Sequence, residues 1–180
     1  MRMNTESDAN LKKWINNASE NEIEDVIRQF GEESNAKKIS KKIVEVRQNR
    51  LINDTNDLAE IIKSVSQFKK NKIHPATKTF QAFRIFINNE LDEIQKLLSS
   101  IDDMMKVGSR LVFISFHSLE DRLIKNFFRP KKINYPRDIP INNEIEIRYK
   151  ALGKKIRASK DEIKINPRSR SAILRAFEKI

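Results

Sequence analysis

The chain has 180 residues, which is enough for one domain, or for one domain with a small subdomain, and for a buried core. It contains no cysteine and only two histidines, which excludes disulfides and thiolate metal sites and argues against a histidine zinc centre. The net charge of +11 is uneven, because residues 1–60 hold 10 Lys and Arg against 12 Asp and Glu, whereas residues 61–180 hold 26 against 13.

The first 66 residues are predicted to be helical. Apolar side chains recur at helical spacing over residues 8–17, 20–31, 33–50 and 55–65. Ser19 and Glu22 match a capping box, Gly31 is expected to end the second helix, and Thr55 can cap the fourth. Trp14 is the only tryptophan, and it is either a core residue of an amphipathic helix or a platform that stacks on RNA.

A polar, basic connection at residues 67–72 separates this helical part from the rest. His74 precedes Pro75, which favours an extended backbone, and Thr77 can cap a helix that runs to about Ser99. Gly108 then ends a turn before Arg110–Phe116, a continuous apolar run. The length of this run predicts a strand buried on both faces, as in a parallel sheet flanked by helices.

The remainder is predicted to contain one helix and two further strands. Ser118 can cap a helix that runs through Phe128 and carries carboxylates in its first turn, where the helix dipole favours them. The later elements are a proline-broken loop at residues 130–140, a strand over 144–152, a helical turn after Ser159 and a final strand over 172–178. Because only one strand is central, we expect an incomplete sheet and a chain that is poorly stable or associates in isolation.

No stretch approaches the ~20 apolar residues of a membrane span, and the first residues contain no apolar signal core. The absence of cysteine fits a reducing compartment. We therefore expect a cytoplasmic protein with no membrane partner. A basic surface attracts nucleic acid, although lysine-rich codon usage would leave only ordinary solvated faces.

Six segments stand in the order and spacing of one known family. They are Met1-Arg2-Met3, Ala18-Ser19-Glu20, Phe30-Gly31-Glu32-Glu33, His74-Pro75-Ala76-Thr77, Ile114-Ser115-Phe116-His117-Ser118-Leu119-Glu120-Asp121-Arg122 and Asn166-Pro167-Arg168-Ser169-Arg170-Ser171. In these segments the chain resembles the MraW family of ribosomal RNA methyltransferases. The resemblance implies methyl transfer from S-adenosylmethionine to the exocyclic N4 of a cytosine, with 16S ribosomal RNA or the small ribosomal subunit as the partner.

The same resemblance implies an α/β fold, made of a partial Rossmann-like methyltransferase domain and an all-helical insertion subdomain. Residues 1–66 would be the insertion, which helps to recognise RNA, and residues 67–180 the C-terminal part of the methyltransferase domain. In the family, the glycine-rich loop that binds the cofactor lies before the segment matched by Met1-Arg2-Met3. Gly31, Gly108 and Gly153 lie far apart, so we expect a C-terminal portion of the family with no S-adenosylmethionine site.

The candidate catalytic residues are His117 and Glu120. They follow the central strand, where open α/β sheets place groups that contact ligands. The exocyclic amine of cytosine is a weak nucleophile, so catalysis needs acceptors and close alignment. A neutral His117 imidazole can accept a hydrogen bond from the amine or contact a phosphate. Glu120 either contacts the target base or stabilises the helix terminus electrostatically. Capping and dipole compensation alone explain Ser118 and Asp121.

The candidate RNA-binding residues are cationic or imidazole side chains outside that loop, namely Arg168, Arg170, Lys131, Lys132 and His74. Arg168 and Arg170 alternate before the final strand and should point to one side, toward phosphate or toward solvent. The two lysines suit loose attraction to the RNA backbone but are also typical of a solvated loop. His74 either contacts RNA or positions the turn beside Pro75.

Three function classes stay open at this point. The chain is an enzyme of the methyltransferase family, a non-catalytic RNA-binding remnant of it, or a purely structural helical protein with no RNA role. Binding of S-adenosylmethionine separates the first two classes. RNA affinity that does not fall with added salt would favour the third, because phosphate contacts release counterions.

Overall fold

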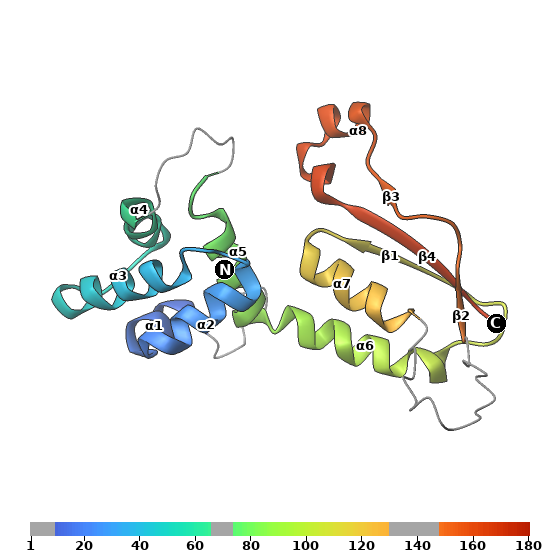
Figure 1. Cartoon of the computed structure of the whole chain (residues 1–180), viewed down its shortest axis with the longest axis horizontal. Coiled ribbons are helices and arrows are strands. Elements are labelled where there is room, and N and C mark those ends of the chain that lie inside the picture. The colour runs from blue at the N-terminus through green and yellow to red at the C-terminus, as the bar shows by residue number, and fades with distance from the viewer. Residues whose placement is uncertain (1–9, 66–73, 130–147) are drawn as a thin grey trace, which may run out of the picture. The chain divides into compact units, whose positions relative to one another are not determined.

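The structure, a computed structural model of the chain, describes residues 10–65, 74–129 and 148–180 (Figure 1). The chain divides into two compact units, Met1–Glu90 and Leu91–Ile180, called unit 1 and unit 2 below. The predicted connection at 67–72 and the predicted loop at 130–140 lie outside the described residues. Within the part that is described, no helix is long and apolar enough to cross a membrane.

Unit 1 is helical, as the apolar spacing predicts. Its described helices are α1 (Leu11–Asn17), α2 (Glu20–Gly31), α3 (Ala36–Asn49), α4 (Thr55–Val65) and α5 (Thr77–Asn88). The capping box at α2 is confirmed, since the Glu22 amide donates to Ser19 Oγ and the Ser19 amide donates to the Glu22 carboxylate. The apolar faces of these helices form one core, with Ile27, Ile43 and Phe83 fully buried.

Gly31 has a different role from the predicted one. It is the last residue of α2, and the left-handed residue that ends the helix is Glu32, with φ of 47°. A Cβ atom on Gly31 would lie 2.9 Å from the Lys78 carbonyl oxygen of α5. The glycine is therefore required because two helix backbones approach closely, and not because of a positive φ.

Two predicted caps are wrong by one position. Thr55 and Thr77 are the first residues of their helices. At α4 the Asp54 carboxylate accepts from the amides of Asn56 and Asp57, at 2.8 and 2.9 Å. Ala76 precedes α5 and offers no side-chain cap. The shift arises because the Asp54 carboxylate takes the free amides at the start of α4, while the turn at His74 already orders the start of α5.

The long helix predicted from Thr77 to Ser99 is two helices. Asn89 adopts a left-handed conformation with φ of 50° and separates α5 from α6 (Glu90–Met104). Asparagine is one of the few residues that adopts this conformation at low cost, so the break follows from residue chemistry that the apolar spacing does not report.

Unit 2 contains a small antiparallel sheet. After α6 it has β1 (Arg110–Ser115), α7 (Ser118–Phe127), β2 (Tyr149–Ala151), β3 (Ile156–Arg157), α8 (Lys160–Ile165), the 3₁₀ helix η1 (Pro167–Ser171) and β4 (Ile173–Lys179). β4 pairs with β1 over its length, while β2 and β3 pair with the two ends of β4 (Figure 1). The Ser159 cap of α8 is confirmed, because its hydroxyl accepts from the Glu162 amide.

Helices cover one face of this sheet. Phe113 and Phe177 point to the side on which α6 and α7 pack, and the rings of Phe128 and Phe177 stack at 3.9 Å. The alternate residues of β1 lie on the other face and are largely exposed. The predicted parallel strand buried on both faces is therefore wrong for the described residues, because β1 is an outer, antiparallel strand with helices on one side only.

The compact units meet at Glu90 and Leu91, later than the predicted domain boundary at residues 66 and 67. The reason is that α5 packs against α2 and shares the core of unit 1. The combination of helices and strands confirms a mixed α/β chain. The assignment of residues 1–66 and 67–180 to an insertion and a methyltransferase portion stays a prediction.

Candidate functional site

The loop between β1 and α7 holds both predicted catalytic residues. We call the group formed by Phe116, His117, Glu120, Asp121 and Arg175 the β1–α7 site. The strand ends at Ser115, and His117 keeps an extended backbone, with φ of −143°, before the helix begins. The end of an apolar strand and the start of an amphipathic helix thus bring polar side chains to one edge of unit 2.

His117, and not Ser118, is the N-cap of α7. The His117 Nδ1 atom accepts from the Glu120 amide at 3.4 Å, and the Glu120 carboxylate accepts from the Phe116 amide at 2.7 Å. Ser118 is the first helical residue, so its predicted capping role is wrong. An imidazole reaches the third amide of the helix as a serine hydroxyl does, and nothing in the residue pattern separated the two positions.

The other nitrogen of His117 is left without a hydrogen bond. The imidazole is only 7% exposed, and its Nε2 atom lies 3.3 Å from a Glu120 carboxylate oxygen in a direction that makes no hydrogen bond. Buried polar atoms nearly always have a partner. The arrangement therefore fixes the ring through Nδ1 and leaves the Nε2 proton of the neutral ring without a hydrogen-bond acceptor among the described residues.

Glu120 is held as a carboxylate. Burial raises the pKa of this group, but the nearby His117 imidazole and the amides of Phe116 and His117 outweigh burial, so the pKa lies below its ordinary value. Near neutral pH Glu120 is therefore a hydrogen-bond acceptor. Its two oxygens face the backbone and the imidazole, which means that the residue orients the loop whether or not it also contacts a ligand.

Asp121 and Arg175 form an ion pair that the sequence analysis missed. The Arg175 guanidinium donates to both carboxylate oxygens, at 2.7 and 3.0 Å, and both side chains are less than one fifth exposed. The Arg175 hydrogen bond is the main cause that holds the pKa of Asp121 below its ordinary value, against the effect of burial. The sequence did contain a signal for this pair, because Arg175 stands within the apolar segment of β4. A charged side chain in such a segment needs a partner of opposite charge.

The predicted RNA-binding arginines lie on η1 and are exposed. Neither Arg168 nor Arg170 forms an ion pair with a described residue. The prediction that they point to one side is wrong, because a 3₁₀ helix has three residues per turn and side chains two positions apart diverge by about 120°. The rest of the motif is structural, since the Asn166 side chain accepts from the Arg168 amide and Ser169 is buried.

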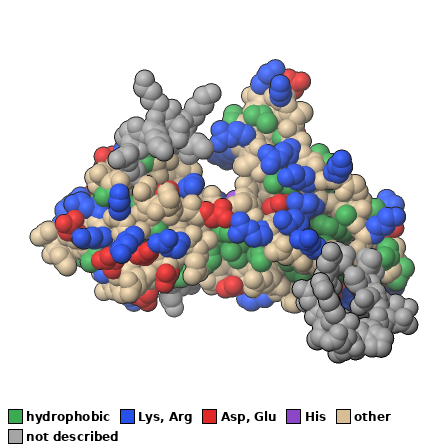
Figure 2. Space-filling view, in the orientation of Figure 1, with side chains coloured by type: hydrophobic (Ala, Val, Ile, Leu, Met, Phe, Trp, Pro, Cys, Tyr) green, Lys and Arg blue, Asp and Glu red, His purple; other side chains and the backbone are tan. Residues whose placement is uncertain are grey.

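The remaining predicted residues are not part of the β1–α7 site as described. His74 belongs to unit 1, where its Nδ1 accepts from the Ala76 amide at 3.2 Å and orders the turn before α5. Lys131 and Lys132 lie outside the described residues. Lys and Arg side chains are spread over the face of unit 2 that Figure 2 shows, with few carboxylates among them.

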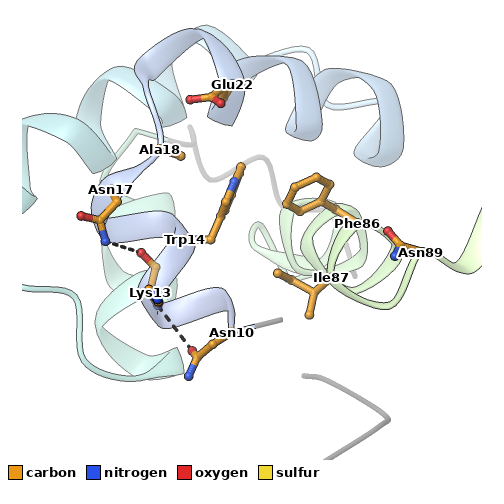
Figure 3. A pocket seen from close by; sticks show the side chains of 9 residues that line it. All are labelled: Asn10, Lys13, Trp14, Asn17, Ala18, Glu22, Phe86, Ile87 and Asn89. Atoms are coloured by element: carbon orange, nitrogen blue, oxygen red, sulfur yellow. Dashed lines mark hydrogen bonds between the residues drawn. The ribbon is translucent and has the colours of Figure 1, made fainter. Parts of the chain in front are cut away.

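A cavity of about 640 Å³ opens in unit 1 beside Trp14. Its wall includes Trp14 from α1 and Phe86 from α5, whose rings lie 4.7 Å apart, with Asn10 and Asn17 at its border (Figure 3). Trp14 also contacts Phe83 edge-on. Trp14 therefore packs against the core of unit 1, as one of its two predicted roles requires. Its ring also lines the cavity.

A sequence profile of the MraW methylase family matches residues 1–180. The chain belongs to the MraW methylase family. It is 46% identical over 182 residues to a protein of Coxiella burnetii (strain Dugway 5J108-111) named ribosomal RNA small subunit methyltransferase H. Proteins of the same name from Chromohalobacter salexigens and Rickettsia bellii are 42% and 43% identical.

All of the chain is covered in these matches, but only 59%, 56% and 61% of the three relatives. The chain thus spans about three fifths of their length. For a member of the MraW methylase family, the described residues do not fit a methyl donor. Gly31 is packed against α5, while Gly108 and Gly153 occupy separate turns with φ of 83° and 82°, so the described residues contain no glycine-rich loop.

Proposed function

We propose that this chain is the RNA-facing portion of an S-adenosylmethionine-dependent methyltransferase that acts on the N4 of a cytosine in 16S ribosomal RNA. The observation that carries the proposal is the match of the MraW methylase family over all 180 residues. The names of the relatives support a small-subunit RNA substrate. In this proposal residues 1–66 are the helical insertion, and residues 67–180 the C-terminal part of a Rossmann-like domain.

The β1–α7 site supplies the chemistry that this reaction asks of the acceptor side. The donor supplies the methyl group, and the residues of this chain hold the cytosine. His117 is oriented through Nδ1, which accepts, so Nε2 of the neutral ring carries the proton and can donate to a phosphate or to an acceptor atom of the cytosine. The Glu120 carboxylate keeps the imidazole and the loop in place. Asp121 and Arg175 act as positioning residues, because their ion pair fixes α7 against β4.

The proposed RNA contacts are the exposed arginines of η1 together with the predicted residues Lys131, Lys132 and His74. Arg168 and Arg170 are exposed and diverge, so they suit two separate phosphates. The excess of Lys and Arg over Asp and Glu in residues 61–180 provides long-range attraction to the RNA.

A chimera tests the activity. Residues 1–180 replace the matching region of the Coxiella burnetii relative, and the protein is incubated with S-adenosylmethionine and small ribosomal subunits that lack the modification. We expect a methyl group on N4 of one cytosine, read by mass spectrometry of digested RNA. A chimera that binds S-adenosylmethionine and RNA but transfers no methyl group would contradict the proposal.

The role of His117 has its own test in that chimera. Asparagine is a good N-cap, so His117→Asn should keep the free energy of unfolding within about 0.5 kcal/mol while methyl transfer falls at least ~100-fold. His117→Ala is the comparison, because it removes both the cap and the Nε2 donor and should cost about 1 kcal/mol as well. Full activity of His117→Asn would show that the residue only caps the helix.

The second candidate is the non-catalytic RNA-binding remnant, which the scattered glycines and the excess of Lys and Arg favour. We expect calorimetric titration of the 180-residue chain with S-adenosylmethionine to show no specific heat of binding, and specific binding would favour the enzyme over this candidate. An inactive chimera together with salt-sensitive RNA binding by the chain would select this candidate.

A further inference from the structure

Three exposed cations of unit 2 surround the Asp121–Arg175 ion pair. They are Lys125 of α7, Arg157 of β3 and Lys155 directly before β3. The Arg175 hydrogen bond is the largest cause that lowers the pKa of Asp121. The charges of Lys155 and Lys125 lower this pKa further, so both ammonium groups lie near the carboxylate. We call Lys125, Lys155 and Arg157 the cation strip.

The register of the sheet places the two cations of the β3 segment on the side that α7 covers. Arg157 stands opposite Ile173 of β4, and residues directly opposite each other point to the same face. Ile173 shares its face with Arg175, whose guanidinium reaches Asp121 of α7. Lys155 joins Arg157 on this side, because side chains two positions apart in an extended segment share a face.

The helix α7 adds the third cation. Lys125 lies four residues after Asp121, and side chains at this spacing share one face of a helix. The cation strip therefore follows the junction of α7 with β3. Lys125 is eight residues from His117, which corresponds to about 12 Å along the helix axis. The strip thus runs alongside the helix whose first turn carries the β1–α7 site.

The charge of the cation strip is not neutralised within the described residues. None of its three side chains forms an ion pair with a described carboxylate. Asp121 is already engaged, because the Arg175 guanidinium donates to both of its oxygens. By contrast, Lys42, Lys63 and Lys96 each pair with a carboxylate three residues away on their own helices. Neighbouring cations without such partners attract an anion that carries several charges.

The chemistry of the cation strip fits RNA better than it fits a protein partner. Lys is depleted in protein interfaces, whereas contacts to nucleic-acid phosphates come largely from Lys and Arg. Ile156, the apolar residue between Lys155 and Arg157, points to the other face of the sheet with Leu174. The β3 segment therefore presents its cations to the α7 side without an apolar side chain between them.

We propose that the cation strip binds consecutive phosphates of the RNA strand whose cytosine enters the β1–α7 site. This inference rests on the proposed function and adds to it a contact surface for the backbone, separate from η1. The strip fixes the position of the strand, and contacts to the cytosine select the base. Because its residues touch the backbone alone, the strip affects RNA binding and not the methyl-transfer step.

The salt dependence of RNA binding tests the strip. Two triple variants lose the same charge from exposed positions of unit 2. The strip variant carries Lys125→Gln, Lys155→Gln and Arg157→Gln, and the control carries Lys96→Gln, Lys106→Gln and Lys150→Gln. Binding of a fluorescent single-stranded RNA from the small-subunit target region is measured by anisotropy. The slope of log affinity against log salt should fall by about 2 in the strip variant, for three lost phosphate contacts, and by less than about 0.5 in the control.

The chimera separates this inference from the proposed function. In an active chimera, the strip substitutions should raise KM for small ribosomal subunits about 10-fold and leave kcat within about 2-fold. An inactive parent chimera would contradict the proposed function, while a reduced slope in the strip variant would still support the phosphate contacts.

Two results would overturn the cation strip even if the chimera is active. The first is an equal slope for the strip variant and the control. The second is displacement of the RNA by polyglutamate as effectively as by unlabelled RNA of equal charge, because the surface would then accept any acidic polymer.

Discussion

Gly31 couples two helices of unit 1 through the side chain that it lacks. A Cβ atom there would meet the Lys78 carbonyl oxygen at 2.9 Å and the Ala82 Cβ at 3.3 Å. The first of these neighbours belongs to the backbone and cannot rotate away. The usual preference for alanine in a helix is therefore expected to be reversed at this position.

Gly31→Ala should lower the free energy of unfolding of unit 1 by about 1–3 kcal/mol, because overpacking outweighs the gain in helix propensity. Trp14 is the only tryptophan and lies in unit 1, so its fluorescence during urea unfolding reports on this unit. Gln29→Ala at an exposed position of α2 is the control and should change stability by less than about 0.5 kcal/mol. A stabilised Gly31→Ala protein would show that α5 does not approach α2 this closely.

Asp121 makes the stability of unit 2 depend on pH. Its pKa is lowered by Arg175 in the folded protein, so its contribution is fully present above the ordinary pKa of 3.8 and is lost as the pH falls through the lower folded value. Asp121→Asn should destabilise unit 2 by about 1–3 kcal/mol at pH 7. Hydrogen exchange at the β1 and β4 amides measures this difference, which should shrink below pH 3.8. A constant difference across this range would show that the ion pair contributes nothing.

The helices were largely predictable because each one carries its own signal. Apolar spacing identified α2, α3 and α4, and Ser19 and Ser159 capped helices as expected. The errors lie at helix ends, where a neighbouring residue competes for the same amides. His117 instead of Ser118 caps α7, and Asp54 caps α4.

The break between α5 and α6 depends on one left-handed residue. Asn89→Ala should cost about 1 kcal/mol, since alanine adopts this conformation poorly, and Asn89→Gly should cost less. Circular dichroism and chemical unfolding of the two variants measure the effect. Equal stability of the alanine variant and the parent would mean that α5 and α6 can continue as one helix.

RNA binding by the chain should depend strongly on salt because of the excess of Lys and Arg in residues 61–180. Replacing both Arg168 and Arg170 by alanine should reduce the slope of log affinity against log salt by about 1.5, the value for two lost phosphate contacts. The matched control replaces Lys96 and Lys106, two exposed lysines of unit 2 that lie outside the proposed insertion and outside η1. Equal slopes for the two double variants would remove η1 from the RNA interface.

The sequence by itself determined the class of the chain, the helical character of unit 1, the order of α7, β2, α8 and β4 in unit 2 but not β3 or η1, and the loop that holds His117 and Glu120. These features depend on local periodicity, on capping chemistry and on motifs with fixed spacing, all of which act between residues close in the chain.

Only the tertiary structure decided which elements share a core and which surfaces stay open. It joined α5 to unit 1, paired β1 with β4 in antiparallel register, brought Arg175 to Asp121 and left Ile114 and its neighbours exposed. An apolar run such as that of β1 predicts only that its side chains are removed from water. Which partner removes them from water depends on contacts between residues that are distant in the chain.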